Sequence, residues 1–253
     1  MRVLKLSGHQ VDDSDFLAAF ATAVAKIATE EQVVIVNGGG KSIKTMQEKL
    51  GLREEKIDGL RVTDDESLLV TEMVMSGYVN KLIVRALQQA GVNAIGISGS
   101  DGHLLRAKKK LSAKGDLGHV GEIIEVDTNI LQRLMGAGFV PVVSPVSVAI
   151  EAPNQVYNVN GDEGATAVAQ ALGATQLDFI SNVPGVLRDL ADTAVIPTLT
   201  PAEVNELTAV GIISGGMVPK VKAALDAIAQ GVQQARIVDL PGLLQGGTLF
   251  VAL

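Results

Sequence analysis

Two lysines near opposite ends of the chain are the residues best placed to do chemistry. Lys220 follows Gly215-Gly216-Met217-Val218-Pro219, where the glycine pair and the proline predict the start of a helix. A helix N-terminus carries roughly +0.5 of a charge, so a lysine in its first turn needs an anion beside it. Lys5 lies in the apolar run Val3-Leu4-Lys5-Leu6, where a lysine is expected to be exposed at the strand end or paired. Two cations that both need an anion suggest phosphate chemistry.

A run of three glycines at 38–40 follows the β-branched segment 33–37. Glycines tolerate a sharp bend, and a strand that leads through them into a helix brings backbone N–H groups close to a ligand. A P-loop is excluded, because it requires glycine at position 35, where Ile35 stands. The dinucleotide fingerprint is excluded as well, because it requires glycine in place of Ile43. A tight turn that binds nothing remains an alternative.

Polar residues alternate in Asn158-Val159-Asn160-Gly161-Asp162, just before a predicted helix. In an extended segment the side chains of Asn158, Asn160 and Asp162 point to the same side. Asp162 alone is explained as a helix N-cap, but the two asparagines are not. Asp162 is therefore a candidate to hold the lysine ammonium groups through charge-assisted contacts, not to accept a proton.

Other catalytic classes have little support in the sequence. His9, His103 and His119 are dispersed without the spacing of a zinc site, so no protein-bound metal is expected. Ser98 and Ser181 end apolar runs, but neither lies in a G-x-S-x-G elbow.

Composition narrows the class of protein further. The 253 residues fit one domain or two close lobes, and 47% hydrophobic residues with only 3% aromatic ones suit an α/β layered fold. The net charge of −7 argues against nucleic acid and an acidic membrane surface as partners. Cysteine is absent, no signal peptide is visible and no apolar run reaches the roughly 18 residues that span a bilayer. We therefore expect a cytoplasmic protein.

Short β-branched runs alternate with segments of helical period, which predicts one continuous, mainly parallel sheet with helices on both faces. Strands are expected at 2–6, 33–37, 93–98, 139–144, 177–181, 235–239 and 248–252. Helices are expected near 13–29, 42–50, 65–90, 127–136, 162–172, 201–209 and 217–230. The stretches 103–126 and 145–159 break the alternation, and the second is predicted to be a β-hairpin over Pro153-Asn154.

The longest predicted helix, 65–90, opens with the capping pattern Thr63-Asp64-Asp65-Glu66. One face is apolar through Leu68, Met75, Val79, Leu82 and Ala86. Further apolar residues form what would be a second buried face: Val70, Met73, Val74 and Ile83. Such a second face would suit a subunit interface.

Seven blocks in order resemble the amino acid kinase family, and within it the members that phosphorylate N-acetyl-L-glutamate. The blocks are Lys5-Leu6-Ser7-Gly8, Asn37-Gly38-Gly39-Gly40, Leu60-Arg61-Val62-Thr63, Leu117-Gly118-His119-Val120-Gly121, Asn158-Val159-Asn160-Gly161-Asp162, Ser181-Asn182-Val183-Pro184-Gly185-Val186 and Gly215-Gly216-Met217-Val218-Pro219-Lys220. Their joint order is far more specific than any single block, and they cover nearly the whole chain. The resemblance implies a three-layer αβα sandwich around a mainly parallel sheet, with a β-hairpin lid. It implies one domain, 1–253, with an N-terminal lobe of about 1–175 for the acyl-amino acid and dimerisation and a C-terminal lobe of about 176–253 for the nucleotide.

The activity that the resemblance implies is phosphorylation of the side-chain carboxylate of N-acetyl-L-glutamate by ATP with Mg²⁺, in arginine biosynthesis. Catalytic roles would fall to Lys5, Lys220 and Asp162. Substrate would be bound by Gly39, Gly40, Arg61 and Asn158. ATP would be bound by Gly8, Asn182, Val183, Pro184, Gly185, Val186, Leu187, Ile212, Ile213 and Ser214.

The chain departs from the family pattern at three positions. Ser7 stands where a second glycine is common, Asn37 replaces a frequent histidine, and Asn182 replaces a frequent aspartate. Only four residues precede Lys5, where hexameric, arginine-inhibited members carry a helical extension. The resemblance therefore implies a homodimer of the arginine-insensitive type, with 65–90 at the interface.

Two alternatives remain open. A kinase of lysine biosynthesis, acting on an aminoadipate or glutamate group attached to a carrier protein, would share every phosphate-handling residue. It would be expected to show a basic rim for the acidic carrier. A non-catalytic nucleotide-binding regulator is supported only by Ser7 and Asn182.

Overall fold

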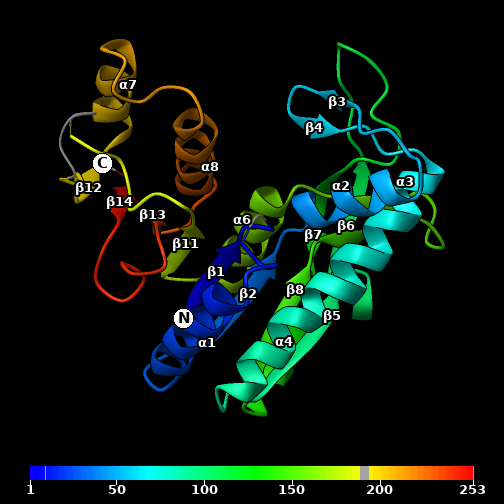
Figure 1. Ribbon diagram of the computed structural model, residues 1–253, viewed down its shortest axis with the longest axis horizontal. Coiled ribbons are helices and arrows are strands. Elements are labelled where there is room, and N and C mark those ends of the chain that lie inside the picture. The colour runs from blue at the N-terminus through cyan, green and yellow to red at the C-terminus, as the bar shows by residue number, and fades with distance from the viewer. Residues whose placement is uncertain (9, 189–193, 253) are drawn as a thin grey trace.

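The computed structural model describes residues 1–8, 10–188 and 194–252, and its centre is an eight-stranded sheet (Figure 1). The strand order is β12-β14-β13-β11-β1-β2-β8-β5. The strands are β1 (Arg2–Leu6), β2 (Val33–Asn37), β5 (Ala94–Ser98), β8 (Val140–Ser144), β11 (Gln176–Ile180), β12 (Thr198–Leu199), β13 (Gln234–Val238) and β14 (Thr248–Val251). All neighbours are parallel except β13 and β14. The predicted mainly parallel sheet is confirmed.

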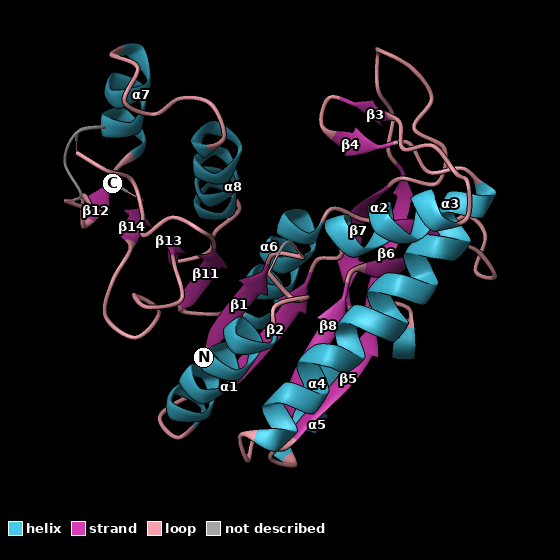
Figure 2. Cartoon of the chain, viewed as in Figure 1, coloured by secondary structure: helices cyan, strands magenta, loops and turns pink. Residues whose placement is uncertain are grey.

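Side chains on the central strands alternate between two cores, because successive residues of a strand face opposite sides of the sheet. On β1, Val3 packs into the core with α5, α6 and α8, whereas Leu4 and Leu6 pack into the core with α1 and α4. The helices on the first face are α5 (Asn129–Gly136), α6 (Gly161–Leu172), α7 (Pro201–Ala209) and α8 (Met217–Ala229). On the second face lie α1 (Ser14–Ala28), α2 (Gly40–Lys49), α3 (Asp65–Thr71) and α4 (Asn80–Gln89). Helices thus flank the sheet on both faces, as predicted (Figure 2).

Two smaller sheets complete the chain. A four-stranded sheet has the order β10-β9-β6-β7, from β6 (Leu105–Lys109), β7 (Gly121–Val126), β9 (Val146–Ala149) and β10 (Val156–Asn158). Its β9 and β10 pair in antiparallel fashion, which confirms the hairpin predicted over 145–159. The second sheet is the hairpin of β3 (Lys56–Ile57) and β4 (Leu60–Arg61), which was not among the strands predicted from the sequence.

The predicted helix 65–90 is one continuous rod whose middle, η1 (Glu72–Val79), is π-helical. This stretch changes the phase of the helix, and Val70, Val74 and Ile83 are buried within this chain. The expectation that these three residues form a second face for a partner was therefore wrong. The large apolar side chains that this helix does expose are Leu69, Met73 and Tyr78, each about half exposed.

The same helix, Asp65–Gln89, is long and apolar enough to cross a membrane by length and composition alone. Half of its apolar window is buried inside the protein, where α4 packs against α1 and β5. A buried core helix passes the same test, so this is weak evidence for a membrane span.

Candidate active site

The site lies where the C-terminal ends of three adjacent parallel strands meet. Leu6 of β1 is in register with Asn37 of β2 and with Ile180 of β11, so the segments that leave these strands begin side by side. A cavity of about 400 Å³ opens at this edge. It is lined by residues from the glycine run 38–40, the β3–β4 hairpin, the segment 158–162 and the start of α8. In open α/β sheets this edge is the usual place for a ligand.

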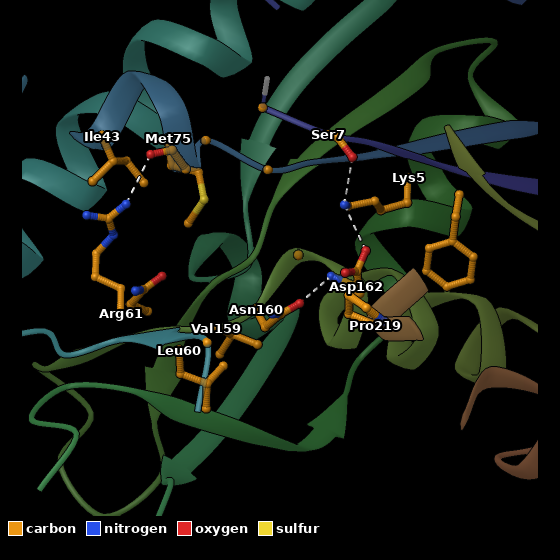
Figure 3. A pocket seen from close by; sticks show the side chains of 18 of the residues that line it. Lys5, Ser7, Ile43, Leu60, Arg61, Met75, Val159, Asn160, Asp162 and Pro219 are labelled. Carbon is orange, nitrogen blue, oxygen red and sulfur yellow. Dashed lines mark hydrogen bonds and ion pairs between the residues drawn. The ribbon is translucent and has the colours of Figure 1, made fainter. Parts of the chain in front are cut away.

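Lys5 is directed into the cavity by the alternation of β1. It has the same strand phase as Val3, and this phase faces α6 and α8. Its Nζ lies 2.8 Å from Asp162 Oδ1 and donates a hydrogen bond of 3.0 Å to Ser7 Oγ (Figure 3). The Ser7 hydroxyl in turn donates to the Ile180 carbonyl oxygen at 3.2 Å. The lysine in the strand is therefore paired, as the sequence led us to expect.

Lys220 reaches the same cavity from the first turn of α8. Its Nζ donates to Ser181 Oγ at 2.5 Å and to Asn182 Oδ1 at 3.0 Å. Burial lowers the pKa of Lys220 below its usual range, the nearby charge of Lys5 lowers it further, and the charge of Asp162 partly offsets both. Two ammonium groups that repel each other across one cavity form a ready site for an anion.

Asp162 contacts Lys5 directly, whereas the direct partners of Lys220 are Ser181 and Asn182. The interpretation of Asp162 as a helix N-cap is wrong. The cap of α6 is Asn160, whose Oδ1 accepts from the backbone N–H of Asp162 at 2.7 Å. The carboxylate is therefore left to face Lys5 from the first turn of the helix.

The glycines bring two loops into direct backbone contact. A Cβ atom at Gly8 would lie 2.8 Å from the Cα and N atoms of Gly39, so no larger residue fits there without a shift of the backbone. Gly38 donates its N–H to the Leu6 carbonyl at 2.9 Å. Helix α2 then begins at Gly40, so its free N–H groups lie at the cavity wall.

Arg61 lies across the cavity from Lys5 and Asp162 (Figure 3). Several partners hold its guanidinium group. Its Nη2 lies 2.7 Å from Glu54 Oε1 and donates to the Gly40 carbonyl at 3.0 Å. Its Nη1 donates to Gln47 Oε1, and Gln47 Nε2 donates to Ser67 Oγ at 2.9 Å. Burial lowers the pKa of Arg61, while the charge of Glu54 opposes this shift. The guanidinium is fixed before any ligand arrives.

Asn158 also lines the cavity, and its orientation follows from its neighbour. Thr63 uses its single hydroxyl proton to donate to the Arg61 carbonyl at 3.0 Å. Thr63 Oγ1 must therefore accept from Asn158 Nδ2, which lies 3.1 Å away. The Asn158 Oδ1 atom is left as an acceptor.

Of the residues expected to bind ATP, Gly8 lines this cavity, whereas the segments 182–187 and 212–214 do not. From 182–187 and 212–214, only Asn182 touches one of its lysines, while the neighbouring Ser181 lines the wall. Val186 and Ile213 are buried in the core between the sheet and α8. The expected nucleotide residues thus adjoin the end of the cavity that holds Lys220.

Several residues that line the cavity were not predicted from the sequence. Lys56, Gly59 and Leu60 come from the β3–β4 hairpin, and Met75 comes from the π-helical stretch. A signal for the hairpin was present, because Asp58-Gly59 is a typical type I′ turn and both residues have positive φ, 52° and 79°. Nothing in the sequence pattern predicts a π-helical turn.

The part of the chain that the structure describes contains no group of three His, Cys, Asp or Glu residues that could hold a metal ion. His119 pairs with Asp65 at 2.7 Å in a loop, and His103 lies in a 3-10 turn. His9 lies outside the described residues. Asp162 is the single carboxylate among the described residues of the cavity wall.

Known proteins similar to this chain agree with the geometry. Residues 1–239 match the model of the amino acid kinase family. Acetylglutamate kinase of Chloroflexus aurantiacus (strain ATCC 29366 / DSM 635 / J-10-fl) is 48% identical over 98% of this chain and 95% of that protein. Acetylglutamate kinase of Methanopyrus kandleri is 41% identical over 98% of this chain and 99% of that protein. The solved structure of smu.665 from Streptococcus mutans UA159 superimposes with a TM-score of 0.82 at 29% identity, covering 99% of this chain and 98% of the other. The chain belongs to the amino acid kinase family.

Proposed function

We propose that this chain transfers the γ-phosphoryl group of ATP to the side-chain carboxylate of N-acetyl-L-glutamate, giving N-acetyl-L-glutamyl 5-phosphate and ADP. It is then a phosphotransferase with a carboxyl group as acceptor, and arginine biosynthesis is the context in which we place it. The observation that carries this proposal is that one cavity holds Lys5, Lys220 and Asp162 at one end and Arg61 with Asn158 at the other. Relatives named acetylglutamate kinase match the chain over nearly its whole length.

Phosphoryl transfer at the lysine end requires positive charge to stabilise the transition state and does not require a general base. The side-chain carboxylate of the substrate has an unperturbed pKa of roughly 4.3, so it is ionised at neutral pH and attacks without losing a proton. Negative charge spreads over the oxygens of the transferring group in the transition state. The ammonium groups of Lys5 and Lys220 and the free N–H groups at Gly39 and Gly40 would stabilise this charge.

The other end of the cavity fits an acylated amino acid. Asn158 Oδ1 is free to accept the amide N–H of an acetylated substrate, since Asn158 Nδ2 is committed to Thr63. Arg61 supplies the positive charge for the free carboxylate. The wall described here has no carboxylate besides Asp162, which pairs with Lys5, so nothing offers a counter-ion to the free ammonium group of glutamate.

ATP would reach the lysines from the side of Ser181 and Asn182, which Lys220 already contacts. Two predictions remain here: that 182–187 and 212–214 line the nucleotide site, and that 1–175 and 176–253 act as lobes. Mg²⁺ would be held mainly by the phosphates, because the one carboxylate of the described wall is paired with a lysine. Bound with the nucleotide, Mg²⁺ would neutralise part of the negative charge of the phosphates.

Charges around the substrate end favour a small substrate over an acidic carrier protein. The loop after β6 contacts the β3–β4 hairpin through Lys114, which pairs with Asp58 at 2.5 Å. The two lysines where this loop begins are also paired, Lys109 with Asp116 at 2.9 Å and Lys110 with Glu163 at 2.5 Å. A rim neutralised in this way lacks the excess positive charge that would attract an acidic carrier.

We further infer a cytoplasmic homodimer in which the helix 65–89 lies at the interface. Its exposed apolar side chains, Leu69, Met73 and Tyr78, support this inference. Sedimentation of the purified protein would show a dimer, and the variant Met73→Glu would shift it toward the monomer. A monomeric wild-type protein would refute the inference.

One assay tests the proposed activity. The pure protein is incubated with ATP, Mg²⁺ and hydroxylamine, which traps an acyl phosphate as a hydroxamate, and N-acetyl-L-glutamate, glutamate and aminoadipate are offered in turn. We expect product with N-acetyl-L-glutamate alone. No product with any of the three, from a protein that binds ATP, would contradict the proposal and favour a carrier-linked substrate or a regulator.

A further inference from the structure

The end of the cavity that holds Arg61, called the carboxylate end from here on, contains a second positive charge, that of Lys56, which has no role so far. Lys56 and Arg61 are directly opposite each other in the β3–β4 hairpin. Residues at opposed positions project to the same face of a hairpin, and like charges there destabilise the pairing. Both side chains line the cavity. Two-residue strands that carry this repulsion need an anion between the two cations.

Glu54 is the anion that the chain itself provides. Its Oε1 lies 2.7 Å from Arg61 Nη2 and 3.2 Å from Lys56 Nζ, so the two cationic nitrogens are no farther apart than the sum of these distances. This oxygen is buried and has no well-aligned hydrogen bond, so the contacts are mainly electrostatic. Two positive groups and one negative group leave a net charge of +1. That charge matches a single carboxylate of a ligand.

Arg61 alone cannot hold this carboxylate by two parallel hydrogen bonds. Each of the two bidentate edges of a guanidinium includes Nη2, paired with either Nη1 or Nε. Nη2 donates to the Gly40 carbonyl oxygen and lies 2.7 Å from Glu54 Oε1, so a ligand carboxylate at either edge would compete with Glu54 for this nitrogen. Arg61 can therefore offer only single donors, and the second contact to a carboxylate must come from another residue.

We propose that Lys56 supplies this contact and is a substrate-binding residue for the free carboxylate of N-acetyl-L-glutamate, the one that is not phosphorylated. The inference rests on the proposed function. Glu54 acts as a positioning residue, because it holds Lys56 beside Arg61 before the substrate arrives. The β3–β4 hairpin thus carries both cations of the carboxylate site.

A substrate analogue makes the test specific. The variant Lys56→Ala is compared with wild type on N-acetyl-L-glutamate and on the analogue whose free carboxylate has become an amide. With the natural substrate we expect kcat/KM to fall about tenfold, mostly through KM, because a half-exposed charge contributes less than a buried one. With the amide analogue the variant and wild type should differ little. Lys56→Arg should restore most of the loss.

The matched control is Lys44→Ala. Lys44 is 53% exposed, against 52% for Lys56, and it also pairs with a carboxylate, Glu48, but it does not line the cavity. An unchanged kcat/KM in Lys56→Ala, or an equal loss with both substrates, would overturn the inference. Calorimetry gives the Kd of N-acetyl-L-glutamate without turnover and should show the same tenfold change. A wild-type protein that neither binds nor phosphorylates this compound would instead refute the proposed function itself.

Discussion

The two ends of the cavity are built in different ways. The carboxylate end comes mainly from residues close together in sequence, 40–67, with Asn158 added from β10, and Arg61 and Gln47 there are buried and held by several hydrogen bonds. The phosphate end joins Lys5 and Lys220 from opposite extremes of the chain, and both remain partly exposed. One end is fixed in advance, and the other is held by contacts that a ligand can replace.

The contrast separates residues that bind the substrate from residues that catalyse its phosphorylation. The free carboxylate keeps its charge throughout the reaction, so a group that binds it contributes similarly to the ground state and the transition state, which lowers KM. The hydroxyl and amide partners of Lys220 are neutral, so a phosphate oxygen can take their place and gain a charge-assisted bond. We therefore expect variants at the lysine end to change kcat and variants at the arginine end to change KM.

The largest effect is expected for the lysines. Lys5→Ala or Lys220→Ala should lower kcat by about 10² to 10³, by analogy with the loss of one preorganised donor. The KM of N-acetyl-L-glutamate should change little. Lys222→Ala is the control, because Lys222 lies on the same helix and pairs with Asp226 at 2.6 Å on the surface. Steady-state kinetics check this, and wild-type kcat in either lysine variant would contradict the catalytic role.

Arg61 should produce the next largest effect, at the opposite end. Arg61→Met removes the buried cation and leaves Glu54 without its closest partner. We expect the KM of N-acetyl-L-glutamate to rise on the order of 10²-fold, because loss of one partner from a buried charge pair is costly. The KM of ATP should stay near wild type. An equal rise in the KM of ATP in Arg61→Met would contradict the expectation that the two ends bind their ligands independently.

A smaller effect is expected at Asn158. Asn158→Asp keeps the shape but places a carboxylate next to the substrate amide and the free carboxylate. The KM of N-acetyl-L-glutamate should rise about tenfold, through the loss of the amide donor to Thr63 and repulsion of the substrate. Discrimination against unacetylated glutamate should weaken, since its ammonium gains a counter-ion. A competition assay with both substrates measures this ratio, and an unchanged ratio would count against the role of Asn158.

The smallest effect concerns pH. Lys220 has a lowered pKa, so its ammonium loses its proton at a lower pH than an ordinary lysine, and kcat should fall on the alkaline side accordingly. Asp162 opposes this shift, so Asp162→Asn should lower the pKa of Lys220 further and move the alkaline limb to lower pH. Glu163→Gln, which disturbs the pair with Lys110 on the same helix turn, is the control and should leave the limb in place. A shift to higher pH in Asp162→Asn would contradict this electrostatic account.

Much of the fold followed from the sequence because its central strands are strongly β-branched and its helices are long. The run Val33–Asn37 and the alternation around Lys5 sufficed to place both in the sheet, and the family blocks marked the segments that meet at its edge. The β3–β4 hairpin was missed because two-residue strands are too short to show a period. Val70 and Val74 were predicted to be buried, but against a partner and not within the chain, because the π-helical stretch that breaks the 3.6-residue repeat could not be foreseen.

Contacts that join distant residues could not be derived from a local pattern. No spacing rule connects Arg61 with Gln47 and Glu54, or Lys220 with Ser181. These pairs depend on how separate elements pack, and only the family resemblance suggested which residues belong to one site.

The most direct test of the account is a crystal structure of the protein with a non-hydrolysable ATP analogue, Mg²⁺ and N-acetyl-L-glutamate. We predict that the ammonium groups of Lys5 and Lys220 both lie within hydrogen-bonding distance of the terminal phosphate region, with Lys220 released from Ser181 and Asn182. A complex in which either lysine has no contact with the triphosphate would contradict the central claim that the two act on one phosphoryl group.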